Sequence, residues 1–393
     1  MPVGFRGGMP ENVRVLLVDL SKRFGGASVR ALTLASNLEP WDAAIAGLKD
    51  SPVIKAAEEK KIPVKVVGQN RTDPLIPFRL MNIIHRERFQ VMDTQNIQSK
   101  FWGSMAAYMS NVTFVSTLNS SYKDEHAGSW KGTVYSAIDR LTNHRADGYI
   151  AVSNSIRTEL LRSGVSDDEV DLVTNAVNIE VSDFSRDRAS VRRQIGVPED
   201  CVLCISVGRL VWAKGYDIFI EAFARVAEVM PQVRAVILGD GELYDSLLRQ
   251  VQEHGLENKI KLPGYCDRNT VLSVLGAADI FVMTSRSEGV PFAILEAAAF
   301  GLPILATNCG GIPEILTDRE DAILVPTEDP SLVSAGLIKM VNNKDLMKEI
   351  GANAAKNIKQ NFSLDAQLRA TRLAYLKALK RRQIHPSKMF QQN

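Results

Sequence analysis

Two acidic residues eight positions apart, Glu288 and Glu296, flank the start of a predicted helix. Pro291 suits a first helical turn, residues 292–300 are rich in helix formers, and Gly301 ends the run. The N-terminus of such a helix exposes unpaired amides and a positive dipole end, which would suit a diphosphate. The two carboxylates beside it could accept hydrogen bonds from hydroxyl groups. For either glutamate alone, the alternative is ordinary stabilisation of a helix end.

Two cations, Arg209 and Lys214, lie in a loop of the same half of the chain. Arg209 follows a predicted strand, Lys214 precedes the next helix, and Gly208 and Gly215 accompany them. A guanidinium fork and an ammonium can hold a diphosphate without a metal. Surface cations without a ligand are the alternative, which the neighbouring glycines disfavour. Since no Asp-x-Asp signature lies nearby, the sequence predicts metal-independent chemistry without metal ligands.

Paired glycines, Gly25 and Gly26, lie between the first predicted strand and the helix 29–38. Glycines at a helix start let backbone amides approach a phosphate closely, although an isolated Gly-Gly is more often a simple turn. The loop lacks both the dinucleotide fingerprint and a Walker lysine. An NAD-dependent dehydrogenase is therefore a poorly supported alternative.

Short apolar runs that alternate with helical patterns must position these residues. One series covers residues 13–18, 64–67, 89–92, 112–116, 148–152 and 170–174, and a second covers 202–207, 235–238, 260–262, 280–283, 304–306 and 322–325. Such alternation is typical of parallel sheets covered by helices. The sequence thus predicts two doubly wound α/β domains, at about 1–180 and 196–370, facing a cleft in which ligands bind beyond the strand ends.

The composition is that of a soluble globular protein. The 393 residues, 45% of them hydrophobic, suffice for two domains with substantial cores. A formal net charge of +2, from 47 basic and 45 acidic residues, gives no general attraction to nucleic acid. Cys201 and Cys204 lie three apart in a predicted strand and so face opposite sides, which argues against a shared metal or redox pair. With no signal peptide or membrane span apparent, we expect a cytoplasmic protein.

The C-terminal segment is basic and helical in pattern. A last helix at about 363–382 is expected to pack back on the N-terminal domain, which would then include about 371–393. From Ala366 onward the chain carries seven Lys or Arg and no acid. A solvated helix face is the simpler interpretation, and peripheral contact with an anionic membrane surface is the functional one.

Beyond these patterns, the chain resembles glycosyltransferase family 4, the retaining group 1 glycosyltransferases with the GT-B fold of two Rossmann-like domains. The resemblance runs over most of the chain and rests on an ordered set of motifs. They are Gly25-Gly26-Ala27, Gly208-Arg209-Leu210 with Lys214-Gly215, Leu238-Gly-Asp-Gly-Glu242, Pro263-Gly264-Tyr265, Ala278-Asp279-Ile280-Phe281-Val282, Ser285-x-x-Glu288-Gly289-x-Pro291, Glu296-Ala297, Gly301-x-Pro303-Ile304 and Gly310-Gly311-Ile312-Pro313-Glu314.

The resemblance implies roles for the site residues. Arg209 and Lys214 would bind the donor diphosphate, Glu288 the hydroxyls of the transferred sugar, and Glu296 the ribose. The further donor-binding residues would be Val290, Pro291, Phe292 and Ala293 at the phosphates or sugar, Tyr265 and Cys266 at the nucleobase, and Gly25, Gly26 and Asn119. The catalytic group would be Glu288, Arg209 and Lys214, with no cofactor beyond the nucleotide diphosphate sugar.

The implied chemistry is loss of a nucleoside diphosphate from an oxocarbenium-like sugar, with charge growing on the leaving phosphate. Retention of configuration implies same-face attack by the acceptor, assisted by that phosphate, and no glutamate nucleophile. A lipid-linked glycan or cell-surface polysaccharide is the expected acceptor, bound by loops such as 71–79 and 119–131.

The N-terminal half departs from the family pattern. Similar proteins carry Thr-x-His where this chain has Thr117-Leu118-Asn119, and often have histidines in place of Asp93 and Gln95. Asn119 can bind a hydroxyl but cannot relay a proton. His126 could compensate, although an exposed loop histidine is the simpler interpretation. The departure keeps open a non-catalytic nucleotide-sugar-binding subunit of a glycosylation complex.

Overall fold

The computed structural model describes residues 12–120, 146–179, 181–184 and 187–384. These residues form two compact units. The first contains residues 12–120, 146–173 and 365–384, and the second contains the described residues of 174–364. Within that part of the chain, no helix is both long and apolar enough to span a membrane.

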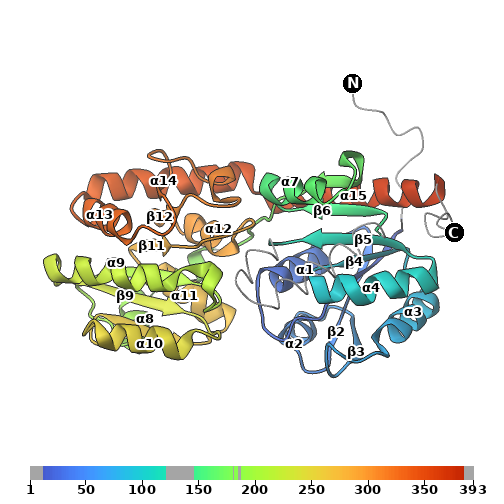
Figure 1. The fold of residues 1–393 in the computed structure, drawn as a ribbon, viewed down its shortest axis with the longest axis horizontal. Coiled ribbons are helices and arrows are strands. Elements are labelled where there is room, and N and C mark those ends of the chain that lie inside the picture. The colour runs from blue at the N-terminus through green and yellow to red at the C-terminus, as the bar shows by residue number, and fades with distance from the viewer. Residues whose placement is uncertain (1–11, 121–145, 180, 185–186, 385–393) are drawn as a thin grey trace. The chain divides into compact units, whose positions relative to one another are not determined.

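The first unit contains a parallel sheet with the strand order β3-β2-β1-β4-β5-β6-β7 among its described residues (Figure 1). Its strands are β1 (Arg14–Asp19), β2 (Asp42–Leu48), β3 (Val64–Gly68), β4 (Val91–Thr94), β5 (Thr113–Leu118), β6 (Gly148–Ala151) and β7 (Val170–Leu172). The helices are α1 (Gly26–Asn37), α2 (Pro52–Glu59), α3 (Ile76–Glu87), α4 (Ile97–Ser110), α7 (Asn154–Arg162) and the 3₁₀ turn η1 (Asp167–Glu169).

The second unit has a parallel sheet with the order β10-β9-β8-β11-β12-β13. Its strands are β8 (Val202–Val207), β9 (Val233–Leu238), β10 (Ile260–Gly264), β11 (Ile280–Met283), β12 (Ile304–Thr307) and β13 (Ile323–Val325). The helices are α8 (Arg188–Gln194), α9 (Tyr216–Val229), α10 (Tyr244–Glu253), α11 (Arg268–Ala277), α12 (Phe292–Ala299), α13 (Pro330–Val341) and α14 (Lys344–Asn361). Three 3₁₀ turns are η2 (Val181–Asp183), η3 (Trp212–Lys214) and η4 (Ile312–Glu314).

Both sheets follow the order of doubly wound folds, and the predicted α/β class with two Rossmann-like domains is confirmed. The central strands β1, β4, β5, β6, β11 and β12 are buried on both faces, which explains their continuous apolar runs. The predictions missed β2, whose sequence Asp-Ala-Ala-Ile-Ala-Gly-Leu is poor in β-branched residues. It becomes a strand because it pairs with both β1 and β3, an interaction that local propensity does not encode.

The last helix, α15 (Leu364–Ile384), lies mainly in the first unit, as predicted (Figure 1, red). Tyr375 is fully buried and donates a 2.6 Å hydrogen bond to Asp93 Oδ2. A Cβ on Gly148 would lie 3.2 Å from the Ala378 Cβ, so the helix packs closely on β6. Lys377 also pairs with Asp171.

Several basic residues of α15 have hydrogen-bond or ion-pair partners within the first unit. Besides Lys377, Arg382 lies 3.6 Å from Asp147 and donates to Asn111, and Arg381 donates to the Asp147 carbonyl. Arg369 pairs with Asp365 one turn earlier. Much of the positive charge therefore already has partners within the fold, which weakens the membrane interpretation of this segment.

Candidate donor-binding site

The cationic loop, which carries Arg209 and Lys214, and the acidic loop, which carries Glu288, follow neighbouring strands of the second sheet. Strands β8 and β11 are paired in parallel, so the loops that follow them emerge at the same edge. Lys214 ends η3 after β8, while Glu288 lies between β11 and α12. The fold therefore brings together residues separated by 74 positions.

Lys214 and Glu288 form a direct ion pair. The Lys214 Nζ lies 2.6 Å from Glu288 Oε1, and the Ser285 hydroxyl donates to the same oxygen at 2.6 Å. The Glu288 side chain is only 6% exposed and that of Lys214 is 19% exposed. A carboxylate so deeply buried needs such partners, because desolvation disfavours an isolated charge. The pair thus places an acid and a cation next to each other at the carboxyl edge of the sheet.

Close backbone packing fixes the position of Glu288. Gly310 has φ +54°, and a Cβ there would lie 1.9 Å from the Glu288 carbonyl oxygen. The amide of Gly311 donates to that oxygen at 3.1 Å. Contact with the acidic loop therefore requires a glycine at position 310.

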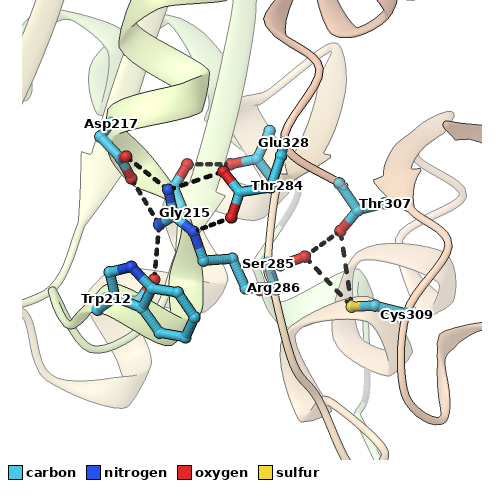
Figure 2. Close-up of polar contacts among 9 residues, drawn as sticks. All are labelled: Trp212, Gly215, Asp217, Thr284, Ser285, Arg286, Thr307, Cys309 and Glu328. Carbon is cyan, nitrogen blue, oxygen red and sulfur yellow. Dashed lines mark hydrogen bonds and ion pairs between the residues drawn. The ribbon is translucent and has the colours of Figure 1, made fainter. Parts of the chain in front are cut away.

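Gly215 is the residue at which the cationic loop packs against the acidic loop. Its φ is +60°, and a Cβ there would lie 2.1 Å from the Thr284 carbonyl oxygen. The Thr284 hydroxyl donates to the Gly215 carbonyl at 2.7 Å (Figure 2). Any larger residue at position 215 would push apart the loops that carry Lys214 and Glu288.

Arg209 follows the end of β8 and is half-buried. The backbone around it is tight, since a Cβ on Gly239 would lie 1.8 Å from the Gly208 carbonyl oxygen. The Tyr216 hydroxyl lies 2.8 Å from where a Gly208 Cβ would be. Burial, and then the charge of Glu288, raise the pKa of Tyr216, which stays neutral. Tyr216 could not be singled out from the sequence, because a lone tyrosine at a helix start gives no functional signal.

Glu296 lies inside α12 and pairs with Arg268, the first residue of α11, at 2.5 Å. Burial raises the pKa of Glu296, and the Arg268 charge partly offsets that rise. Arg268 was missed by the sequence analysis, since a lone arginine after a helix cap has no distinctive pattern. It gives the predicted ribose-binding acid a cationic neighbour.

The segment between the two glutamates is firmly anchored. Val290 is buried and its carbonyl accepts a 2.8 Å hydrogen bond from Asn175. Pro291 is the N-cap of α12 in an extended conformation, one residue earlier than a first-turn proline would be. Phe292 is 8% exposed, and Ala293 is half-buried. The helix start itself lies at the same sheet edge as Lys214.

Tyr265 and Cys266 follow β10, again at the carboxyl edge of the sheet. Gly264 before them has φ +85°. The Tyr265 side chain is 63% exposed, so its ring is accessible for stacking, whereas burial raises the pKa of the half-buried Cys266 thiol. Among the described residues, no cluster of three or more His, Cys, Asp or Glu could hold a metal ion.

The remaining predicted residues belong to the first unit. Gly25 is the N-cap of α1 and Gly26 its first residue, and a Cβ on Gly25 would meet nothing within 4 Å. That open space is compatible with a ligand approaching the backbone. The Asn119 side-chain amide donates to the Gln95 carbonyl at 3.0 Å. His126 and residues 121–131 lie outside the described residues.

Asp93 and Gln95, which replace histidines common in the family, are both fully buried. The Asp93 carboxylate accepts hydrogen bonds from Thr117, at 2.8 and 3.0 Å, and from Tyr375. Burial raises the pKa of Asp93 to about 6, although these hydrogen bonds and the charge of buried Arg30 oppose the rise. Asp93 therefore links the sheet to α15 and does not face an open site.

Comparisons with known proteins identify the family of this chain. Residues 187–357 match the family model described as glycosyl transferases group 1, and residues 24–181 match that of glycosyltransferase family 4. Because the two models together span most of the chain, this chain belongs to the group 1 glycosyltransferases with the GT-B fold and is a glycosyltransferase.

Two curated relatives illustrate the similarity. A D-inositol 3-phosphate glycosyltransferase from Streptomyces bingchenggensis is 26% identical over 304 residues, covering 72% of this chain and 67% of its own. A phosphatidylinositol N-acetylglucosaminyltransferase subunit from Arabidopsis thaliana is 31% identical over 236 residues, covering 60% of this chain and 50% of its own. The chain thus matches half of the length of the plant subunit.

A solved structure supports the fold. Anabaena HepE in complex with UDP and glucose superposes with a TM-score of 0.81 at 21% identity, covering 93% of this chain and 99% of that one.

Proposed function

We propose that this glycosyltransferase moves a sugar from a nucleotide diphosphate sugar to an acceptor with retention of configuration and without a metal. The observation that carries the proposal is the buried Lys214–Glu288 pair at the carboxyl edge of the second sheet, beside Arg209. An ammonium has three N–H donors, so Lys214 can keep its bond to Glu288 and still donate to a phosphate. The acid would then meet the sugar while the cation meets the diphosphate.

The electrostatics favour departure of the nucleoside diphosphate. Negative charge grows on the leaving phosphate as the sugar becomes oxocarbenium-like. Arg209, Lys214 and the amides at the start of α12 would stabilise that charge, which leaves no role that requires a metal ion. Glu296, with Arg268 beside it, would accept hydrogen bonds from the ribose, and Tyr265 would stack on the base.

Same-face attack by the acceptor would explain retention in this site. The leaving phosphate itself takes the acceptor proton, and Glu288 holds sugar hydroxyls without acting as a nucleophile. This route needs no histidine at position 119. Asn119, next to Gln95, would contribute only a hydrogen bond to the donor.

The proposed acceptor is a lipid-linked glycan or a cell-surface polysaccharide precursor. The names of the inositol-modifying relatives support a lipid or polyol acceptor. An open hollow of about 570 Å³ at the ends of β2 and β3, whose lining includes Lys49, Gln69, Asn70, Thr72, Asp73 and Arg79, offers several polar groups to sugar hydroxyls. Peripheral contact with an anionic membrane would then involve the exposed side chains of Leu373 and Lys380 on α15, since Lys377 already pairs with Asp171.

A second candidate is a donor-binding subunit of a glycosylation complex without its own turnover. The observation that favours it is Asn119 in place of the family histidine, and the plant relative is itself named as a subunit. Both candidates require donor binding, and only the first requires turnover.

Thermal-shift measurements with uridine, guanosine and adenosine diphosphate sugars test the proposed donor site, with and without EDTA. One donor class is expected to raise the melting temperature of the wild type equally in both conditions, because a bound ligand stabilises the folded state. Arg209→Met is expected to reduce that shift. No shift with any donor, or a shift abolished by EDTA, would contradict the proposal.

A further inference from the structure

Arg286 is a cation beside the proposed site that no motif of the sequence singles out. Its Nη1 donates to the Trp212 carbonyl and to Asp217 Oδ1, both at 2.8 Å. Its Nη2 donates to Asp217 Oδ2 at 2.7 Å and to Glu328 Oε2 at 3.1 Å, and its Nε donates to Glu328 Oε1 (Figure 2). All five guanidinium N–H donors are thus in use.

These bonds exclude a direct role for Arg286 in holding phosphate. Its side chain is only 9% exposed, and the hydrogen bond with Asp217, together with Glu328, raises its pKa further. Two carboxylates already surround the single positive charge. A diphosphate could bind the guanidinium only by displacing these two carboxylates. The Arg286 charge therefore serves a purpose other than phosphate binding.

The partners of Arg286 lie on separate elements. Trp212 begins η3, Asp217 lies in the first turn of α9, and Glu328 lies between β13 and α13. The guanidinium also stacks over the Trp212 ring, 4.8 Å from its centroid. Glu328 has φ +60°, an unfavourable conformation for a residue with a side chain, which shows that its position is imposed by surrounding contacts.

The backbone of Arg286 completes the link between the two loops of the site. Its amide donates to the Ala213 carbonyl at 2.8 Å. Ala213 immediately precedes Lys214, and Arg286 lies two residues before Glu288. The Arg286 side chain therefore holds η3 through Trp212, and the Arg286 backbone joins η3 to the acidic loop.

We propose that Arg286 is a positioning residue that sets the separation and orientation of Lys214 and Glu288 for the donor. The assignment rests on the proposed function of that pair. Without the guanidinium, Asp217 and Glu328 repel each other, and η3 loses the bond to the Trp212 carbonyl while keeping its backbone links to the 284–288 segment and the Lys214–Glu288 pair. Lys214 would then lose its alignment, which affects transition-state stabilisation more than ground-state binding, because misplacement by about 1 Å can cost about a hundredfold in rate.

Three variants and a matched control test this inference. Arg286→Met is expected to lower kcat by about a hundredfold with a small change in KM. Arg286→Lys keeps the charge but not the planar fork, so its kcat should fall between those of Met and wild type. Glu328→Gln, on a 55% exposed side chain, should give a smaller loss. The control is Arg225→Met, which removes an arginine on the same helix as Asp217 that pairs with Glu221 and Ser331, and it should leave kcat unchanged.

A double variant separates positioning from general destabilisation. If Arg286 acts through Lys214, then combining Arg286→Met with Lys214→Met should cost little more in kcat than Lys214→Met alone. Losses that multiply fully would overturn the inference, as would an Arg286→Met protein with wild-type kcat.

A measurement that needs no substrate tests the positioning role of Arg286 separately from the proposed function. Amine-reactive labelling followed by mass spectrometry reports the accessibility of Lys214, which should rise several-fold in Arg286→Met while Lys356 stays unchanged. Equal labelling of Lys214 in wild type and variant would overturn the positioning role even if no donor is ever turned over. Failure of all donors to bind or react in the wild type would instead overturn the proposed function.

Discussion

At the scale of single residues, the site depends on an opposed pair of charges placed before any ligand arrives. Glu288 is buried with two donors on one oxygen, Lys214 and Ser285. Because burial of an unpaired carboxylate is costly, Lys214 offsets the cost of burying Glu288 besides its proposed contact with the donor. The structural role of Lys214 and its proposed catalytic role therefore depend on the same ammonium group.

Substitution of Lys214 separates these two demands. Lys214→Met is expected to lower kcat by about two to three orders of magnitude, since it removes one preorganised cation at the leaving phosphate. It should also lower the free energy of unfolding by about 3 kcal/mol, because a buried carboxylate loses its partner. Lys214→Arg should restore most of the stability and less of the rate. Steady-state kinetics and urea unfolding provide the two readouts.

Wild-type rates in Lys214→Met would exclude the lysine from the reaction. A loss of stability without a loss of rate in the remaining folded protein would leave Lys214 as a purely structural partner of Glu288.

At the scale of secondary-structure elements, the site is an assembly of three loops at one sheet edge. The loops after β8, β11 and β12 touch through glycines whose Cβ positions are already occupied by neighbouring carbonyl oxygens. These contacts restrict the backbone positions of Glu288 and Lys214.

Gly310→Ala tests this arrangement. The added Cβ would lie 1.9 Å from the Glu288 carbonyl at a φ of +54°, so the loop must shift. We expect a loss of unfolding free energy above about 2 kcal/mol together with reduced donor binding. Gly196→Ala is the matched control, because Gly196 has φ +69° with nothing within 4 Å of its Cβ. Backbone strain alone should cost it about 1 kcal/mol. Equal losses in the two variants would contradict the contact argument.

Local patterns predicted most strands and the helix after Pro291, because periodicity and helix-stop signals are properties of neighbouring residues. They did not predict β2, whose alanines need β1 and β3 to form a strand. Arg286 and Arg268 were also missed. Their importance comes from partners such as Asp217 and Glu296, which lie 69 and 28 positions away in the chain and meet them only after folding.

At the scale of the whole molecule, the chain returns to its first unit through α15. The contact between Asp93 and Tyr375 joins residues 282 positions apart, a separation that no sequence window reveals. Burial of the carboxyl group makes this junction sensitive to pH, since its pKa is raised to about 6 from 3.8.

The sign of this effect follows from proton binding. Between about pH 4 and 6 the folded protein retains the Asp93 proton more than the unfolded chain does, so the contribution of Asp93 to stability falls as pH rises through this range. The difference in unfolding free energy between wild type and Asp93→Asn should therefore decline from pH 4 to pH 6 and then level off. Denaturant unfolding at several pH values measures it, and a constant difference across the range would contradict the assignment.

Glu288, held by Lys214, is proposed to take part in sugar transfer from a nucleotide diphosphate donor. The most direct measurement follows turnover of the donor that stabilises the protein, by NMR, with wild type and Glu288→Gln compared at saturating donor. We expect a product of the same anomeric configuration as the donor from the wild type, and a rate at least about a hundredfold lower for the variant. An inverted product, or equal rates for the two proteins, would contradict this expectation.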